Sequence, residues 1–195
     1  MTRKLFGFSV LGAVAGLSLV CDAAVWATTA PAPEIRQVGA TAVVYKGPQV
    51  DVALSYRFAK QNPTGRWLLL DTAMTAATQP IELSRTLIAL RTPDGAVVPL
   101  ATQQEFGNDY PQLAGTIARA NATREPMSYL TPHRFRRIGY FAERGHGLSF
   151  PSTWLDQWHN NFGRLFFLLP DGVQKGSYEL LIDLPKGRVA IPFTI

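Results

Sequence analysis

Residues 177–195 read SYELLIDLPKGRVAIPFTI and carry the clearest structural pattern of the chain. On both sides of Pro185-Lys186-Gly187, apolar side chains alternate with polar or small ones. Alternation with a period of two predicts strands that have one buried face. The short turn between the two segments predicts that they pair antiparallel. We therefore expect the chain to end in a β-hairpin whose last strand is tied into a sheet.

Similar strand patterns recur upstream of this hairpin. Residues 50–58 alternate strictly, which predicts a half-buried strand. Residues 67–70 are apolar on both faces, which predicts a central strand within residues 66–76. Residues 81–91 fit either a strand face or a helical stripe. The Pro93-Asp94-Gly95 turn that follows favours the strand, as the first half of a hairpin. Further strands are expected at residues 41–45, 96–100 and 164–169.

About eight strands at this short spacing predict an all-β protein, built as an antiparallel β-sandwich. An immunoglobulin-like arrangement is one form of sandwich that fits the pattern. The likeness to bacterial extracytoplasmic immunoglobulin-like domains is topological only, because the chain lacks their Cys-Trp-Cys signature.

Residues 106–162 interrupt the strand pattern and predict a partly helical insertion. Residues 110–124 have a narrow apolar stripe, with Asp109 as a candidate cap and Pro111 in the first turn. Residues 151–162 predict a second short helix, capped by Ser152. An insertion of this size is longer than an ordinary loop, and such insertions are often functional.

The N-terminus has the three-part pattern of a secretory signal peptide. Arg3 and Lys4 precede the apolar run LFGFSVLGAVAGLSLV, and small residues precede a cut after Ala27. We expect residues 1–27 to be removed, residues 28–35 to form a flexible lead-in, and residues 36–195 to form one domain. Two alternatives are a retained membrane anchor and a lipoprotein modified at Cys21. All three place the domain outside the cytoplasm, and only the alternatives bring it to a membrane.

Composition narrows the chemistry and the partners of the mature protein. The full chain carries a net charge of +5, which favours an anionic partner. Cys21 is the only cysteine, so the mature chain would have no disulfide, no thiolate metal site and no cysteine nucleophile. No cofactor is predicted. Because we expect a periplasmic or secreted location, we expect the partner to be a glycan, a lipid headgroup or a protein and not a nucleic acid.

The insertion contains the residues that we single out as candidate ligand or partner contacts. Arginines bind carboxylate and phosphate groups in bidentate fashion, and neighbouring aromatic rings offer stacking surfaces. The alternative is a solvated loop whose arginines pair with Glu125, Glu143 or Asp156. On the second predicted helix, the tryptophans would share one face with Phe162, which would either bind a ligand or dock onto the sandwich. The candidates are Arg134, Arg136, Arg137, Tyr140, Arg144, Trp154 and Trp158.

These features predict a non-enzymatic accessory or binding domain that contacts an anionic envelope component or a protein partner. One alternative is a hydrolase or metal-dependent enzyme that uses the histidines and acids of the insertion. Its candidate residues are His133, His146, His159 and Ser149. The histidine spacing matches no compact metal-ligand pattern, and GHGLSFP lacks the second glycine of a nucleophile elbow. A second alternative is an assembly subunit that pairs through a strand edge at residues 191–195.

Overall fold

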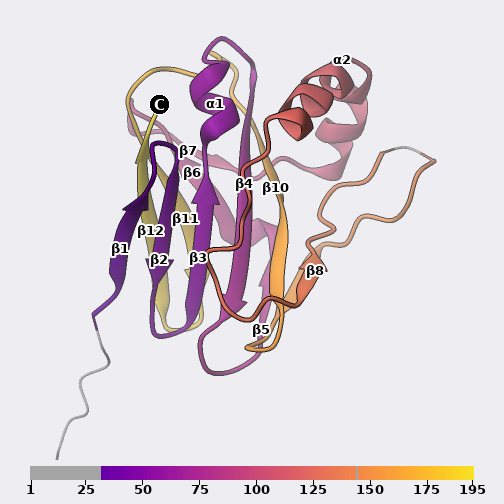
Figure 1. Ribbon diagram of the computed structural model, residues 1–195. Helices are drawn as coiled ribbons and strands as arrows, with labels where there is room; N and C mark the ends of the chain where they lie inside the picture. Colours follow the sequence, from indigo (N-terminus) through magenta and orange to yellow (C-terminus); the bar gives the residue numbers. More distant parts are fainter. Residues whose placement is uncertain (1–31, 144) are drawn as a thin grey trace, which may run out of the picture.

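The protein contains two main β-sheets and a smaller third one (Figure 1). The structure is a computed structural model and describes residues 32–143 and 145–195, so the predicted signal peptide lies outside it. The six-stranded sheet has the order β1-β2-β3-β4-β10-β8, the four-stranded sheet has the order β12-β11-β6-β7, and β5 pairs with β9. The elements are β1 (Glu34–Val38), β2 (Ala42–Lys46), β3 (Val50–Ser55), α1 (Arg57–Gln61), β4 (Trp67–Ala76), β5 (Ile81–Ser84), the short helix η1 (Arg85–Leu87), β6 (Ile88–Arg91), β7 (Val97–Pro99), α2 (Gln103–Ala122), β8 (Phe135–Arg137), β9 (Ser152–Leu155), β10 (Asn160–Leu168), β11 (Ser177–Leu184) and β12 (Gly187–Thr194).

Both hairpins that the sequence predicts are present. β11 and β12 pair antiparallel along their whole length, from Ser177 opposite Thr194 to Leu184 opposite Gly187. β6 and β7 pair antiparallel across the predicted turn, where Gly95 has a φ of 87°. Glycine adopts this left-handed conformation without the steric cost of a side chain. The period-two pattern and the turn residues therefore located these strands correctly.

The two main sheets enclose one apolar core, which confirms a mostly β, antiparallel sandwich type of fold. Inward side chains such as Leu54, Leu70 and Leu165 from the first sheet meet Leu180 and Ile191 from the second. All five are fully buried. Burial of a side chain of this size contributes about 1.5–3 kcal/mol relative to its exposure to water. The sandwich is therefore held mainly by these two interlocking inner faces.

The outer face of the six-stranded sheet is buried as well, because α2 and the segment after it lie across it (Figure 1). Phe106 and Leu113 of α2 belong to one buried cluster with Leu69 of β4 and Phe166 of β10. Residues 127–130 continue the cover over β2, β3 and β4. This second layer explains why residues 67–70 are apolar on both faces. The predicted central strand is confirmed, since β4 lies between β3 and β10.

The first helix of the predicted insertion begins earlier than expected, at Gln103. The Thr102 hydroxyl accepts a hydrogen bond from the Glu105 backbone N–H at 3.1 Å, and the Glu105 carboxylate accepts one from the Thr102 N–H at 2.7 Å. This is a capping box, and its T-x-x-E pattern was readable in the sequence. Asp109 is therefore not the cap, and Pro111 lies inside the helix, where it removes one backbone hydrogen bond.

The second predicted helix, at residues 151–162, is wrong. Residues 152–155 form β9, which pairs with β5, and Asn160 begins β10, which pairs with β4. The helical spacing of Trp154, Trp158 and Phe162 was a coincidence, since both halves of the segment satisfy their backbone groups through distant strands. Trp154 and Trp158 consequently share no helix face.

Three further boundaries differ from the expectations. The strand predicted at residues 50–58 ends at Ser55, and α1 follows, with Phe58 packed into the outer cluster beneath α2. Residues 81–91 form two strands around η1, where the Ser84 hydroxyl accepts a hydrogen bond from the Thr86 N–H. β1 begins at Glu34, within the predicted flexible lead-in.

Candidate functional site

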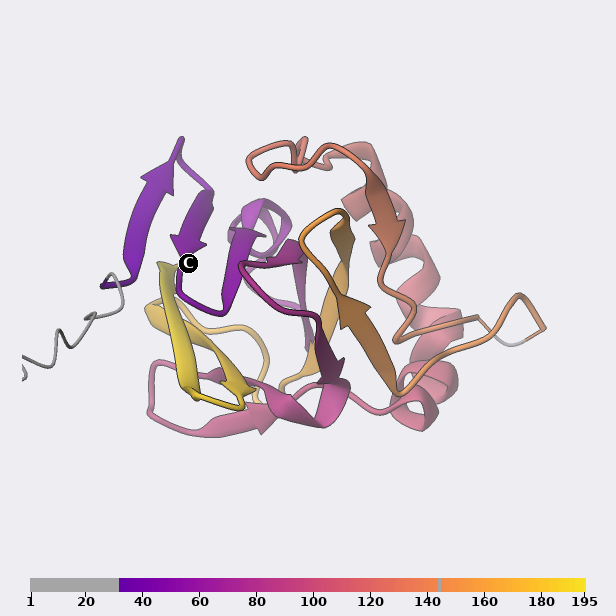
Figure 2. The ribbon, with the colours of Figure 1, turned by 90° about the horizontal axis from the view of Figure 1, so that it is seen from below.

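An elongated cleft of about 820 Å³ lies between α2 and the β8–β10 edge of the six-stranded sheet. The residues that α2 contributes run from Phe106 to Asn121, which corresponds to about 22 Å at 1.5 Å per residue. Residues 137–139, 141–143, 146–148 and 150 supply much of the opposite wall. Figure 2 shows α2 and this segment on the same side of the molecule. The predicted insertion therefore supplies two sides of a long concave feature, α2 and the segment opposite it.

One end of the cleft is basic and is anchored by a buried ion pair. Arg164 of β10 and Asp71 of β4 lie opposite each other in register, with side chains 7% and 8% exposed. Their two contacts measure 3.0 Å from Nε to Oδ1 and 3.2 Å from Nη2 to Oδ2, which is a bidentate geometry. Asn121 of α2 accepts a further hydrogen bond from Arg164 at 3.0 Å. Arg164 is therefore fixed in place.

Two more guanidinium groups line the same end. Arg124 contacts Asp71 at 3.4 Å and lies 5.3 Å from the ring centroid of Phe162, a cation–π arrangement. Arg137 projects from β8 and is exposed. Among the described residues, no hydrogen bond or ion pair occupies Arg137. Arg124, Arg137 and Arg164 thus lie at this end with one carboxylate, Asp71, which contacts Arg124 and Arg164 but not Arg137, so the described residues give this end of the cleft an excess of positive charge.

The other end of the cleft is mostly aromatic. The rings of Phe106, Phe141 and Phe166 pack against one another with centroid distances of 4.9 to 5.1 Å. Phe150 and Leu148 extend this surface to the solvent, and Leu148 is 78% exposed. Exposed apolar side chains beside a groove are typical of binding surfaces. The cleft therefore changes from charged to apolar along its length.

The wall opposite α2 is fastened by polar contacts. The Gln103 side-chain amide donates to the Ala142 carbonyl at 2.6 Å and accepts from the Ala142 N–H at 3.1 Å. Glu143 hydrogen-bonds Tyr110 of α2, and this bond, followed by burial and the nearby charge, raises the pKa of the Tyr110 hydroxyl. The Phe150 N–H donates to the Gly139 carbonyl at 2.7 Å. These contacts shape the apolar end of the cleft before any ligand binds.

The structure places the predicted arginine and tyrosine contacts in different environments. Arg137 lines the cleft, Arg134 is exposed outside it, and Arg144 lies outside the described residues. Arg136 pairs with Asp156 at 3.3 Å, as the solvated-loop alternative expected. The structure corrects the prediction that Tyr140 contacts a ligand, because this residue is 1% exposed and its hydroxyl donates to the Leu83 carbonyl at 2.8 Å. Its ring is thus part of the core and offers no stacking surface.

The tryptophans and histidines do not gather around one site. Trp154 and Trp158 are 55% and 56% exposed, on β9 and in the β9–β10 turn, and neither lines the cleft. The ring Nδ1 of His159 lies 2.9 Å from both carboxylate oxygens of Asp156. Burial alone would raise the pKa of Asp156, but hydrogen bonds from the His159 ring and from two backbone N–H groups hold it below its usual value.

The other two histidines lie apart from this pair. His146 is exposed at the rim of the cleft, and His133 is exposed before β8. Within residues 32–143 and 145–195, no group of three or more His, Cys, Asp or Glu side chains is placed to hold a metal ion. Asp156 contacts His159 rather than His146, so the Ser149, His146 and Asp156 combination is not assembled as a hydrogen-bonded triad in that part of the chain.

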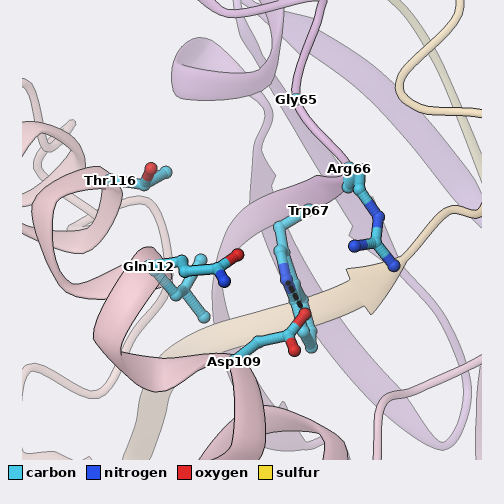
Figure 3. A pocket seen from close by; sticks show the side chains of 7 residues that line it. Gly65, Arg66, Trp67, Asp109, Gln112 and Thr116 are labelled. Atoms are coloured by element: carbon cyan, nitrogen blue, oxygen red, sulfur yellow. Dashed lines mark hydrogen bonds between the residues drawn. The ribbon is translucent and has the colours of Figure 1, made fainter.

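A smaller cavity of about 210 Å³ lies between α2 and the start of β4 (Figure 3). Figure 3 shows the Trp67 ring directed toward Asp109, and the indole N–H donates to the Asp109 carboxylate at 3.1 Å. Ligand pockets usually have volumes of roughly 300–1,000 Å³. This cavity is smaller, and its two central polar groups already satisfy each other, so the larger cleft is the better candidate site.

The strand edge considered for assembly belongs to β12, at one side of the four-stranded sheet. Ile195 and Gly176 form two backbone hydrogen bonds with each other. Because backbone groups alternate in direction along a strand, those of Pro192, three residues earlier, point to the open edge of β12. Proline has no N–H to offer to an incoming strand. This edge is therefore partly protected against pairing with another chain.

Sequence reasoning missed Asp71, Arg124 and Arg164, which form the basic end. The signal for Asp71 was a lone charge inside the apolar run WLLLDTAM. A charged residue that is buried in a strand generally requires a partner, which pattern analysis does not locate. The chain matches no protein family model, no curated protein and no solved structure. Among the described helices, none has the length and apolar character needed to cross a membrane.

Proposed function

We propose that the protein is an extracytoplasmic binding domain that takes an anionic ligand into the cleft between α2 and the β8–β10 edge. The observation that carries the proposal is Arg137, an exposed guanidinium without a partner among the described residues, beside Arg124 and the Arg164–Asp71 pair. Free guanidinium groups in a concave site are suited to carboxylate, sulfonate and phosphate. The ligand is an envelope component or part of a protein partner.

The location rests on the sequence pattern of residues 1–27, and the immunoglobulin-like form of the sandwich remains a prediction. A non-enzymatic role is favoured because the described residues near Arg137 are cations, amides and aromatic rings, and the one carboxylate among them, Asp71, is held in a bidentate pair with Arg164. These groups hold and orient an anion. Among the described lining residues the only acid is Glu143, and it is hydrogen-bonded by Tyr110.

The test measures binding of an anionic fluorescent probe, anilinonaphthalene sulfonate, to the mature chain. Arg137→Gln is expected to weaken binding about tenfold, because a hydrogen bond to a charged group contributes about 1.5–3 kcal/mol. The matched control is Arg134→Gln, which removes the same charge from the same segment but outside the cleft. Equal effects of the two substitutions, or no effect of either, would overturn the proposal.

A further inference from the structure

We infer that the ligand is a single-chain amphiphile: a long acyl chain that ends in a carboxylate or a phosphate. The inference rests on the proposed function and specifies its ligand. It follows from the shape of the cleft and from the position of its charges. It also follows from the polar side chains at its apolar end, which are already hydrogen-bonded within the protein.

The shape of the cleft favours a long, narrow ligand. The lining residues follow α2 for about 22 Å, through several helical turns. The volume of about 820 Å³ is therefore distributed along a groove. A compact sugar or a free inorganic anion would fill only one part of it.

The charges place the head of the ligand at one end. Arg124 lies over the ring of Phe162, Arg137 is opposite Phe162 in the register of β8 and β10, and Arg164 lines the same cleft with its charge already balanced by Asp71. An anionic head that binds there can take two guanidinium groups without breaking the buried pair. Among the described residues, no arginine or lysine lines the opposite end, and the acid in its wall, Glu143, would repel an anion.

The apolar end accepts a chain that needs no hydrogen bonds. Gln103 is engaged with the backbone of Ala142, and Tyr110 is engaged with Glu143. The remaining described wall is largely aromatic and aliphatic, with His146 at the rim. An extended peptide would carry an N–H and a C=O at every residue into this surface, and leaving such groups unpaired is costly. A hydrocarbon chain has no such requirement.

The experiment is isothermal titration of the mature chain with butyrate, octanoate and decanoate, each below its micelle concentration. Affinity is expected to rise about tenfold for each pair of methylene groups that the cleft buries. Decanol, which has the chain without the charge, is expected to bind much more weakly than decanoate. Arg137→Gln should bring the affinity for decanoate about tenfold closer to that for decanol, since Arg124 remains, whereas Arg134→Gln should not.

A second variant tests the tail without disturbing the fold. Leu148→Ser changes a side chain that is 78% exposed, so the core is not affected. It should weaken decanoate binding and leave butyrate binding unchanged. Laurate against monoacyl glycerol phosphate then distinguishes a free fatty acid from a lipid as the source of the chain, by which of them binds more tightly.

The outcomes separate this inference from the proposed function. Affinity that does not depend on chain length overturns the acyl ligand. The anion site still stands in that case if the sulfonate probe continues to require Arg137. Loss of the Arg137 requirement for both the probe and decanoate overturns the two together.

Discussion

Arg164 and Asp71 form a bidentate ion pair beneath the C-terminal end of α2, on neighbouring strands of a sheet that is covered on both faces. The two contacts measure 3.0 and 3.2 Å, and both side chains are less than one-tenth exposed. Asn121 and Arg124 connect this pair to the end of α2. The pair therefore links the outer layer to the sandwich and gives the cleft its basic end.

Removing the carboxylate of this pair is expected to destabilise the protein strongly. Asp71→Asn would leave Arg164 buried without a counter-charge, which typically lowers the free energy of unfolding by about 3 kcal/mol or more. Urea denaturation measures the change. The control is Arg188→Gln, which breaks the exposed Arg188–Asp183 pair on β12 and β11 and should leave the unfolding midpoint nearly unchanged. Similar midpoints for the two variants would contradict a structural role of the buried pair.

The Gln103 clamp, which is the pair of hydrogen bonds between the Gln103 side chain and the Ala142 backbone, should affect both the stability of the fold and ligand binding. Gln103→Ala removes two hydrogen bonds to Ala142, which corresponds to about 1–2 kcal/mol of unfolding free energy. Because the wall opposite α2 then loses a fastening point, affinity for the sulfonate probe should fall as well. Gln104→Ala is the matched control, since Gln104 is the next helical position and is exposed. A probe affinity that is the same in both variants would show that the clamp does not shape the cleft.

Asn160 offers a test of a buried polar group. Its side chain is fully buried, and neither its amide nitrogen nor its oxygen has a hydrogen-bond partner among the residues that the structure describes. Asn160→Leu keeps a similar shape and removes the unsatisfied groups, so it should leave stability unchanged or raise it by about 1 kcal/mol.

The neighbouring Asn161 provides the comparison, because its amide donates to the carbonyls of Met74 and His159. Asn161→Leu should therefore be less stable than Asn160→Leu in thermal and urea unfolding. The reverse order would contradict the prediction that the polar groups of Asn160 cost stability.

Alkaline pH should weaken the hydrogen bond from the Tyr129 hydroxyl to the Glu125 carboxylate, in the segment that follows α2. Burial, then the hydrogen bond to Glu125 and the charge of Glu125, raise the pKa of Tyr129 to about 12 from an ordinary value near 10. A raised pKa in the folded state contributes stability below the unfolded value, and this contribution is lost as the pH rises from about 10 through 12.

The measurement compares the unfolding midpoints of the natural chain and Tyr129→Phe across that pH range. Their difference should shrink as the pH rises, because only the natural chain carries this hydroxyl. Other tyrosines with raised pKa values, such as Tyr45 and Tyr178, titrate in both chains and cancel. A constant difference would show that Tyr129 does not titrate in this window.

Patterns in the sequence predicted those parts of the fold that depend on residues close together in the chain. The PDG and PKG turns and the alternation around them located the two hairpins, because turn chemistry and side-chain period act over a few residues. The same approach failed for residues 151–162, where an apolar spacing of four fits a helix. The choice between helix and strand was made there by β5 and β4, which lie far away in the sequence.

The candidate site was predictable only in outline. The arginine-rich insertion pointed to the correct region, and of the arginines predicted as contacts Arg137 lines the cleft. Tyr140 carried the same signal as a surface aromatic residue, yet it fills the core. Its position depends on Gly163, where a side chain would collide with Ile138, two residues before Tyr140. Such packing relations between separate segments leave no mark in the local sequence.

By itself, the sequence determined the strand-rich class of the domain, its terminal hairpin, and an N-terminal segment with the pattern of an export signal. These follow from side-chain period, turn residues and composition, which act along the chain. The tertiary structure alone decided that α2 covers the outer face of the sheet, that Asp71 meets Arg164, and that Arg137 lines the same cleft as Arg164. Those relations join residues far apart in sequence, and they are fixed by the burial of apolar surface and the pairing of buried charge.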